Sequence, residues 1–171
     1  MSRLALGTVQ FGLNYGVANR SGQVSRSMAK AMLAHALEGG VDMLDTAVAY
    51  GESEECLGEI GTGGFKVVSK LPTVPESCPD IDVWVREQIN MSLTRLGVKS
   101  LYGLLLHRPD QLLEANGKAL YIALQRLKEA GKVQKTGVSI YAPDQLTDLA
   151  SRFRFDIVQA PLNLVDRRLH A

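Results

Sequence analysis

The sequence has few cysteines, almost no net charge and no long apolar run. Of its 171 residues, only Cys56 and Cys78 are cysteines, and 19 Lys and Arg against 18 Asp and Glu leave a formal net charge of +1. Two cysteines far from any pair of histidines indicate neither a disulfide framework nor a zinc site, so we expect no bound metal. A chain with this charge balance and no basic cluster is not expected to bind nucleic acid.

Signals for membrane insertion and export are equally scarce. No apolar run approaches the ~18 residues that mark a bilayer span. The segment 1–10 lacks a charged head followed by a sustained apolar stretch. We therefore expect no membrane partner and a cytoplasmic location.

What the sequence does contain is typical of a globular protein, with 46% apolar and 22% charged residues. A chain of this length buries roughly 70% of the surface that its unfolded form exposes, which is enough for one sizeable core. No linker or low-complexity segment interrupts it. We expect one domain over residues 1–171.

Short apolar runs alternate with amphipathic segments along the chain. Apolar runs without internal alternation are typical of parallel strands buried on both faces, and the amphipathic segments between them are typical of surface helices. The strands are predicted at residues 4–11, 41–47, 66–71, 101–107, 135–140 and 156–161. The helices are predicted at residues 25–38, 54–60 (with Ser53 as its N-cap), 82–96, 119–130 and 144–150. One strand with its helix takes about 30 residues, the size of a βα unit.

Two architectures fit this alternation: a doubly wound open sheet, and a βα barrel whose strands follow sequence order. A dinucleotide-binding Rossmann domain carries Gly-x-Gly-x-x-Gly after its first strand. The segment 11–16, Phe-Gly-Leu-Asn-Tyr-Gly, has two glycines at a different spacing. A barrel has eight strands in ~250 residues, and only six strands are predicted here. Periodicity alone does not choose between the two.

Ionisable side chains stand at the carboxyl ends of three successive predicted strands. Asp45 lies at the end of the second strand, Lys70 of the third and His107 of the fourth. Tyr50 follows in the loop after Asp45. Sites in parallel β/α proteins gather at this edge of the sheet. A single such residue is most often the point where the chain meets water, but three in succession favour a site.

These side chains fit the reduction of a carbonyl group. A buried Lys70 needs a counter-charge, which Asp45 supplies, and its ammonium favours the phenolate form of Tyr50. Tyr50 is therefore a candidate general acid for a carbonyl oxygen, with His107 donating or orienting a second hydrogen bond to that oxygen. The hypothesis is reduction of an aldehyde or ketone to an alcohol.

The same residues resemble the aldo-keto reductase family. The resemblance rests on the segments 6–12, 45–51 (Asp-Thr-Ala-Val-Ala-Tyr-Gly), 127–133 and 137–139, and on Lys70 and His107 at their strand ends. It implies an α/β fold of the TIM (β/α)8-barrel type, with Tyr50 as the proton donor, Lys70 and Asp45 as the pair that tunes it, and His107 as the residue that orients the substrate. It also implies NADPH, or less often NADH, as the cofactor and a small-molecule carbonyl compound as the substrate.

The resemblance implies further contacts to the cofactor. The positions are Gly7, Thr8, Asp45, Ser139, Gln159 and Asn163. The first three lie where the family holds the ribose next to the nicotinamide. Ser139 and Gln159 match the residues around the nicotinamide carboxamide, although Ile140 stands where the family commonly has Asn. Asn163 follows the last predicted strand, and a turn is its alternative role.

The six predicted strands correspond to six of the eight in the family's barrel, so we expect an incomplete barrel. The family's last two strands carry the aromatic residue that stacks on the nicotinamide and the loops that grip the phosphates, so weak cofactor binding is expected. The first and sixth strands remain unpaired edges, which favours a homo-oligomer. The alternative to an NADP-dependent reductase is thus a catalytically impaired half-barrel that serves as a structural or self-associating module.

Overall fold

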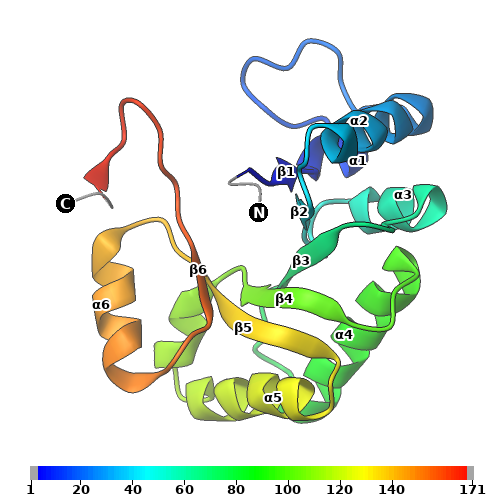
Figure 1. The fold of residues 1–171 in the computed structure, drawn as a ribbon. Helices are drawn as coiled ribbons and strands as arrows, with labels where there is room; N and C mark the ends of the chain where they lie inside the picture. The colour runs from blue at the N-terminus through cyan, green and yellow to red at the C-terminus, as the bar shows by residue number, and fades with distance from the viewer. Residues whose placement is uncertain (1–3, 169–171) are drawn as a thin grey trace.

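Six parallel strands form one curled sheet in the computed structural model, which describes residues 4–168 (Figure 1). The strands are β1 (Leu6–Gly7), β2 (Met43–Asp45), β3 (Lys66–Leu71), β4 (Leu101–Leu106), β5 (Val133–Ser139) and β6 (Ile157–Gln159). They lie in the sheet in the order in which they occur in the sequence. Because a doubly wound sheet reverses its strand order at a switch point, this order shows an incomplete TIM-type barrel.

Helices connect the strands and cover the outer face of the curled sheet (Figure 1). They are α1 (Val9–Gly12), α2 (Arg26–Glu38), α3 (Ser53–Ile60), α4 (Ile81–Leu96), the 3-10 helix η1 (Pro109–Leu113), α5 (Gly117–Glu129) and α6 (Pro143–Arg152). The longest of them, α4, begins after Asp80, whose Oδ1 accepts the backbone N–H of Val83 at 3.0 Å. Such a cap satisfies one of the amides that the first helical turn leaves without a partner.

The core lies between the sheet and the helices. Leu104 and Leu106 of β4 belong to the same buried cluster as Ile89 of α4. Leu105, between the two leucines, is also buried. It lies on the inner side of the sheet, where a Cβ on Gly137 would meet its Cδ2. Strand β4 is therefore buried on both faces, as its unbroken run of leucines predicts.

Glycine on the inner side of the sheet lets β6 approach closely. A Cβ at Gly137 of β5 would lie 1.9 Å from the backbone oxygen of Ile157 in β6. A Cβ at Gly103 of β4 would lie 2.9 Å from Ile157 Cδ1. Only glycine fits at position 137 without displacing β6. The strand can therefore curl inward, and its last residue reaches β2 across the sheet.

The first predicted strand was too long. Residues 4–11 were predicted as one strand, but β1 ends at Gly7 and α1 begins at Val9. The cause is Thr8, whose fully buried hydroxyl donates to the backbone oxygen of Asp45 at 3.0 Å. This contact ends the extended chain and turns it into the short helix. A short apolar run does not by itself distinguish a strand from a buried helical turn.

The predicted start of α3 was also wrong. Ser53 was predicted to cap a helix that begins at residue 54, but it is the first residue of α3, and Glu52 precedes the helix without a side-chain cap. The hydroxyl of Ser53 instead donates to the backbone oxygen of Thr8 at 2.8 Å and lies 3.1 Å from the hydroxyl of Thr46. The short helices α1 and η1 were not predicted at all, so residues 4–168 contain more than the five helices expected.

Within residues 4–168, no helix combines the length and the apolar character that crossing a membrane requires. In the same part of the chain, no group of three His, Cys, Asp or Glu side chains is placed to hold a metal ion, and both cysteines are free.

Candidate active site

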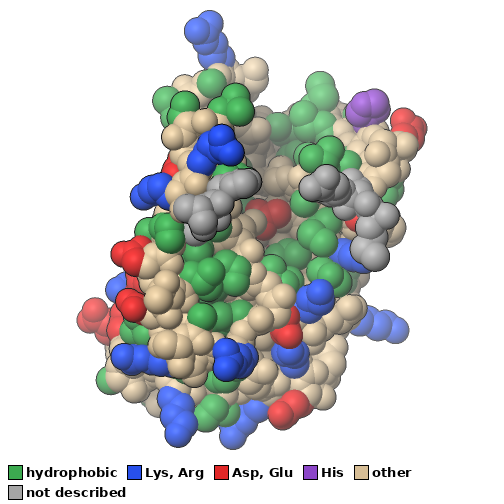
Figure 2. All heavy atoms as spheres, turned by 60° about the vertical axis from the view of Figure 1, so that its left-hand side comes forward, with side chains coloured by type: hydrophobic (Ala, Val, Ile, Leu, Met, Phe, Trp, Pro, Cys, Tyr) green, Lys and Arg blue, Asp and Glu red, His purple; other side chains and the backbone are tan. Residues whose placement is uncertain are grey.

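The carboxyl ends of the strands surround a pocket of about 270 Å³. Parallel strands bring their carboxyl ends to one edge of the sheet, so residues far apart in the sequence meet there. Figure 2 shows a hollowed face of the molecule with hydrophobic side chains gathered around it. The residues that line the pocket are Asp45, Tyr50, Lys70, His107, Ser139, Ile140, Tyr141, Gln159, Ala160 and Pro161.

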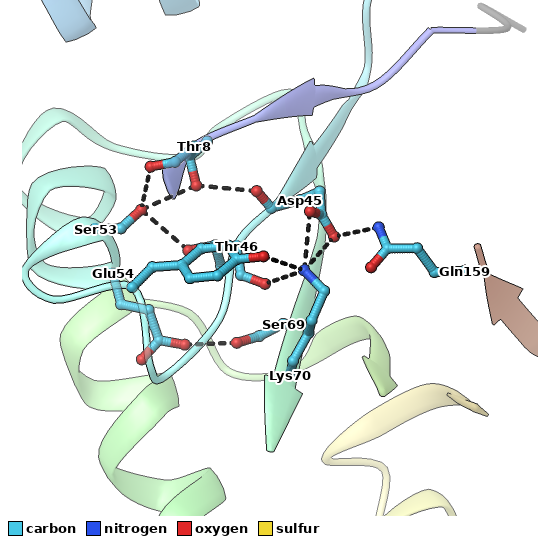
Figure 3. A network of polar contacts seen from close by, with 9 residues as sticks. Thr8, Asp45, Thr46, Ser53, Glu54, Ser69, Lys70 and Gln159 are labelled. Carbon is cyan, nitrogen blue, oxygen red and sulfur yellow. Dashed lines mark hydrogen bonds and ion pairs between the residues drawn. The ribbon is translucent and has the colours of Figure 1, made fainter. Parts of the chain in front are cut away.

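Lys70 is the centre of the polar contacts in this pocket (Figure 3). Its side chain is 2% exposed, and its Nζ donates to Asp45 Oδ1 at 2.8 Å, Asp45 Oδ2 at 2.9 Å and the backbone oxygen of Thr46 at 3.0 Å. A buried ammonium is costly unless paired with an opposite charge and hydrogen-bonded. Both conditions are met here, and the carboxylate of Asp45 holds the Lys70 side chain in position.

The same ammonium also contacts Tyr50. Lys70 Nζ lies 3.1 Å from Tyr50 Oη and 4.8 Å from the centre of the phenol ring. An ammonium only donates, so the phenol oxygen accepts this bond and keeps its own proton available for another acceptor. The contact therefore leaves Tyr50 free to donate a proton into the pocket, with a positive charge already beside the oxygen.

The loop that carries Tyr50 passes close to the end of α1, and this contact sets the position of Tyr50. The backbone N–H of Ser53 donates to the oxygen of Tyr50 at 3.1 Å, which fixes the loop to the start of α3. A Cβ at Gly12, the last residue of α1, would lie 1.9 Å from that same oxygen. The glycine that ends the first apolar run is therefore needed for the backbone of Tyr50 to pass.

His107 lies beside the phenol. Its backbone N–H donates to Leu71 at 3.1 Å, and its ring packs edge-on against Tyr50 with centroids 5.8 Å apart. Burial lowers the pKa of His107, the charge of Lys70 lowers it further, and Asp45 opposes the shift. The imidazole is therefore neutral at neutral pH. It carries one N–H donor that no other side chain among residues 4–168 occupies.

Two of the expected cofactor contacts line the pocket from β5 and β6. Gln159 Nε2 donates to Asp45 Oδ1 at 2.9 Å, a bond across 114 residues of sequence. The side-chain oxygen of Gln159 has no hydrogen-bond partner among the described residues. The same holds for the hydroxyl of Ser139, a residue that is 7% exposed. Ile140, in the position where Asn was expected, is buried at 1% and offers no side-chain donor.

Asp45 also lines the pocket, whereas Gly7, Thr8 and Asn163 differ in their placement. Gly7 pairs with Asp45 between β1 and β2, and the space where its Cβ would project is open. The side chain of Thr8 is buried behind Asp45 and does not line the pocket. Asn163 is exposed, and its Oδ1 accepts the backbone N–H groups of Val165 and Asp166. It therefore serves the turn that was its alternative role.

A buried carboxylate behind the pocket was missed in the sequence. Glu54 of α3 is 1% exposed and accepts hydrogen bonds from Ser69 of β3 and from Ser92 and Arg95 of α4. The available signal is its spacing, because Glu54 stands three residues before the buried Leu57 and hence on the same helix face.

A second cavity, of about 310 Å³, lies between the loops that follow β3 and β4. It contains none of the four side chains expected to be catalytic. Gln111 lies at its wall. The side-chain oxygen of Gln111 accepts the backbone N–H of Val74 at 2.9 Å, and its side-chain nitrogen donates to the backbone oxygen of Val74 at 3.0 Å. This cavity is larger than the pocket at the strand ends, but the side chains expected to be catalytic line the smaller one.

Comparison of the sequence with known proteins gives one family. The aldo/keto reductase family model matches residues 3–171. Aldo-keto reductase YhdN of Bacillus subtilis is 26% identical over 183 residues, which cover 98% of this chain and 52% of that protein. Oxidoreductase YdhF of Escherichia coli is 41% identical over 66 residues, which cover 39% of this chain and 22% of that protein.

Comparison of the structure agrees. A crystal structure from Pseudomonas aeruginosa, assigned to the aldo-keto reductases, is 30% identical and superimposes with a TM-score of 0.81. The match covers 99% of this chain and 66% of that one. The chain thus spans about half the length of the Bacillus subtilis relative and about two-thirds of this solved structure.

Proposed function

Because the chain belongs to the aldo/keto reductase family, we propose that it is an oxidoreductase that reduces a small aldehyde or ketone to an alcohol, with NADPH or NADH as the cofactor. One observation supports this above the others. A single buried ammonium, Lys70, contacts both the carboxylate of Asp45 and the phenol oxygen of Tyr50 in one pocket. This arrangement leaves the phenol proton available. It also places a positive charge beside the phenolate that remains after the proton is transferred to the substrate.

The proton moves from Tyr50 to the substrate. A bound nicotinamide would supply a hydride, with its electron pair, to the carbonyl carbon. The π electrons of the carbonyl bond move to its oxygen, which takes the proton from Tyr50 Oη. The phenolate left behind is 3.1 Å from Lys70 Nζ. A proton from solvent then restores the phenol, so the pocket begins the next turnover in its original state.

His107 orients the carbonyl group. Its neutral ring can donate one N–H bond to the same oxygen that receives the proton, on the side of the pocket next to Tyr50. Two donors converging on one oxygen also favour the charge that develops there as the hydride arrives. We assign His107 this positioning role, because a second proton donor is not needed to balance the reaction.

The residues present fit the nicotinamide end of the cofactor. The unpartnered hydroxyl of Ser139 and the free oxygen of Gln159 offer a donor and an acceptor of the kind that a carboxamide needs. The open space beside Gly7 admits a ring or ribose next to Asp45. The contacts expected for the phosphates are not among these residues. We therefore propose that these residues orient the nicotinamide for reaction, but that the affinity for the whole cofactor is low.

A cofactor titration tests the proposal. We expect saturable binding of NADPH or NADH, measured by fluorescence, and turnover of a small aldehyde. Tyr50→Phe should lower turnover by about 10²- to 10⁴-fold with cofactor binding unchanged. Tyr141→Phe is the matched control, because Tyr141 lines the same pocket but has no contact with Lys70. The absence of binding by folded protein at millimolar cofactor would overturn the proposal.

A second candidate is a self-associating module without activity. Strands β1 and β6 each have one neighbour in the sheet. Beyond β6, Leu162, Leu164 and Val165 are 62%, 96% and 96% exposed. Unpaired edges and exposed apolar side chains favour pairing with another chain. We propose that a second copy occupies this edge.

Light scattering at micromolar concentration measures this association. The expected result is a mass that is a multiple of the single chain. A charge placed on β6 by Val158→Lys should lower that mass, while the same charge on the exposed face of α2, by Met32→Lys, should leave it unchanged. A single-chain mass for the unsubstituted protein at all concentrations would contradict the association.

A further inference from the structure

Glu54 is a buried ionisable residue that the proposed reaction does not use. Its side chain is 1% exposed. Oε1 accepts the hydroxyls of Ser69 at 2.7 Å and Ser92 at 2.6 Å, and Oε2 accepts Nε and Nη2 of Arg95 at 2.9 and 2.6 Å. Removing a carboxylate from water is costly, and four short hydrogen bonds with one cation offset that cost. Such a group is well placed to hold its neighbours in one arrangement.

The carboxylate joins three elements. Glu54 is the second residue of α3, Ser69 belongs to β3, and Ser92 and Arg95 belong to α4. Both oxygens are used, so a shift of any one element breaks at least one of the four bonds. The three elements are therefore fixed relative to one another at this point.

One of these elements, β3, carries Lys70, and another, α3, directly follows the loop that carries Tyr50. Ser69 immediately precedes Lys70 in β3, and successive residues of a strand face opposite sides of the sheet. Ser69 thus faces the helices while Lys70 faces the pocket, as Figure 3 shows. On the helix side, Ser53, the residue before Glu54, holds the backbone oxygen of Tyr50. The bond from Ser69 to Glu54 therefore links the backbone of Lys70 to the backbone of Tyr50 from behind the sheet.

We propose that Glu54 is a positioning residue: through Ser69, it sets the distance between the Lys70 ammonium and the Tyr50 phenol. It touches neither the substrate nor the reacting atoms. The inference rests on the proposed function for the roles of the pair, but the contact of 3.1 Å between Lys70 Nζ and Tyr50 Oη exists without any cofactor. It can therefore be tested on the protein alone.

The chain offers a matched pair of variants. Ser69→Ala and Ser92→Ala each remove one buried hydroxyl that donates to the same oxygen of Glu54. They differ in the element that is released, since Ser69 ties β3 and Ser92 ties α4. A purely structural Glu54 predicts equal effects from the two variants, whereas a positioning Glu54 predicts that only Ser69→Ala disturbs the catalytic pair.

The readout is the ionisation of Tyr50, followed by tyrosinate absorbance in an alkaline titration. The contribution of Tyr50 is obtained by subtracting the same variant with Tyr50→Phe. In Ser69→Ala we expect Tyr50 to ionise at a higher pH than in the unsubstituted chain, because a longer distance to the ammonium of Lys70 stabilises the phenolate less. In Ser92→Ala we expect no shift. Ser69→Thr restores the hydroxyl and should restore the original curve.

Each outcome decides the inference. Equal shifts in the two alanine variants, a shift confined to Ser92→Ala, or no shift in either would show that Glu54 does not set this contact through Ser69 and would overturn the proposal. A shift confined to Ser69→Ala supports it, even if the chain fails to bind cofactor in the separate titration. Failure of the proposed function and failure of this inference are thus distinguishable.

Discussion

Replacing Lys70 by Met gives the sharpest test of how the polar site is held together. Met keeps the apolar stem and removes the ammonium, which makes contacts with Asp45, Thr46 and Tyr50. Breaking a buried ion pair by removing one partner costs about 3–5 kcal/mol of unfolding free energy. Asp45 is 21% exposed and keeps its bond from Gln159, so we expect the lower end, about 3 kcal/mol, for Lys70→Met.

The reverse change is expected to be worse. Asp45→Asn leaves the ammonium of Lys70 at 2% exposure without a counter-charge, so the upper end, about 5 kcal/mol, applies. The double variant Asp45→Asn with Lys70→Met contains no unpaired charge. Adding the second substitution to Asp45→Asn should therefore recover at least about 1 kcal/mol, because the coupling between two groups in contact is large and removing both avoids the stranded ammonium.

Urea unfolding followed by the fluorescence of Trp84, the one tryptophan of the chain, measures these differences. Trp84 packs against the core from α4 and lies away from the site, so the substitutions do not touch the probe. Circular dichroism should give the same midpoints if unfolding is two-state. Free-energy losses of the single variants that add to within about 0.5 kcal/mol in the double variant would refute the reasoning, because they would show that the pair is not coupled.

Three other measurements address pH, packing and capping. Because the pKa of His107 lies below its ordinary value of 6.5, the unfolded chain binds a proton that the folded chain does not. Its contribution to stability should be complete above about pH 6.5 and be lost as the pH falls below it, and His107→Gln should flatten that part of the curve of stability against pH. Gly137→Ala should cost about 1–3 kcal/mol in denaturant unfolding, because its Cβ meets Ile157, whereas Gly63→Ala meets nothing and serves as the control. Asp80→Ala removes the cap of α4 and should lower stability by about 1 kcal/mol; an unchanged midpoint would show that the cap is not formed in solution.

Strands β3 and β4 could be predicted because each is an apolar run that is buried on both faces of the sheet. Where the predicted end of a strand was wrong, a contact with a distant part of the chain determines where the strand ends. Strand β6 was predicted over residues 156–161 but ends at Gln159, since its only partner, β5, ends at Ser139 in register with it. The turn at Thr8 depends on a bond to Asp45, 37 residues away, and no local pattern contains that information.

In the candidate site, too, some features could be predicted from local sequence patterns and others could not. That Asp45, Lys70 and His107 line one pocket could be predicted, because polar residues that end parallel strands meet at one edge of the sheet. The bond from Gln159 to Asp45 could not be found by that rule, because it depends on how tightly the sheet curls at Gly137. Glu54 was passed over since its partners lie on two other elements. In each case the contact joins residues that are far apart in the sequence, so no local sequence pattern predicts it.

The strand order has a consequence for how the chain acquires its structure. Every strand after β1 pairs with the strand just before it, so during synthesis each new βα unit can add to a surface that already exists. The bond from Gln159 to Asp45 is different, because it joins the second unit to the sixth. The pair of Lys70 and Tyr50 can form once three units have folded, whereas the part of the pocket that carries Gln159 forms only with the sixth. Occupancy of the pocket would therefore report that the sixth unit has docked.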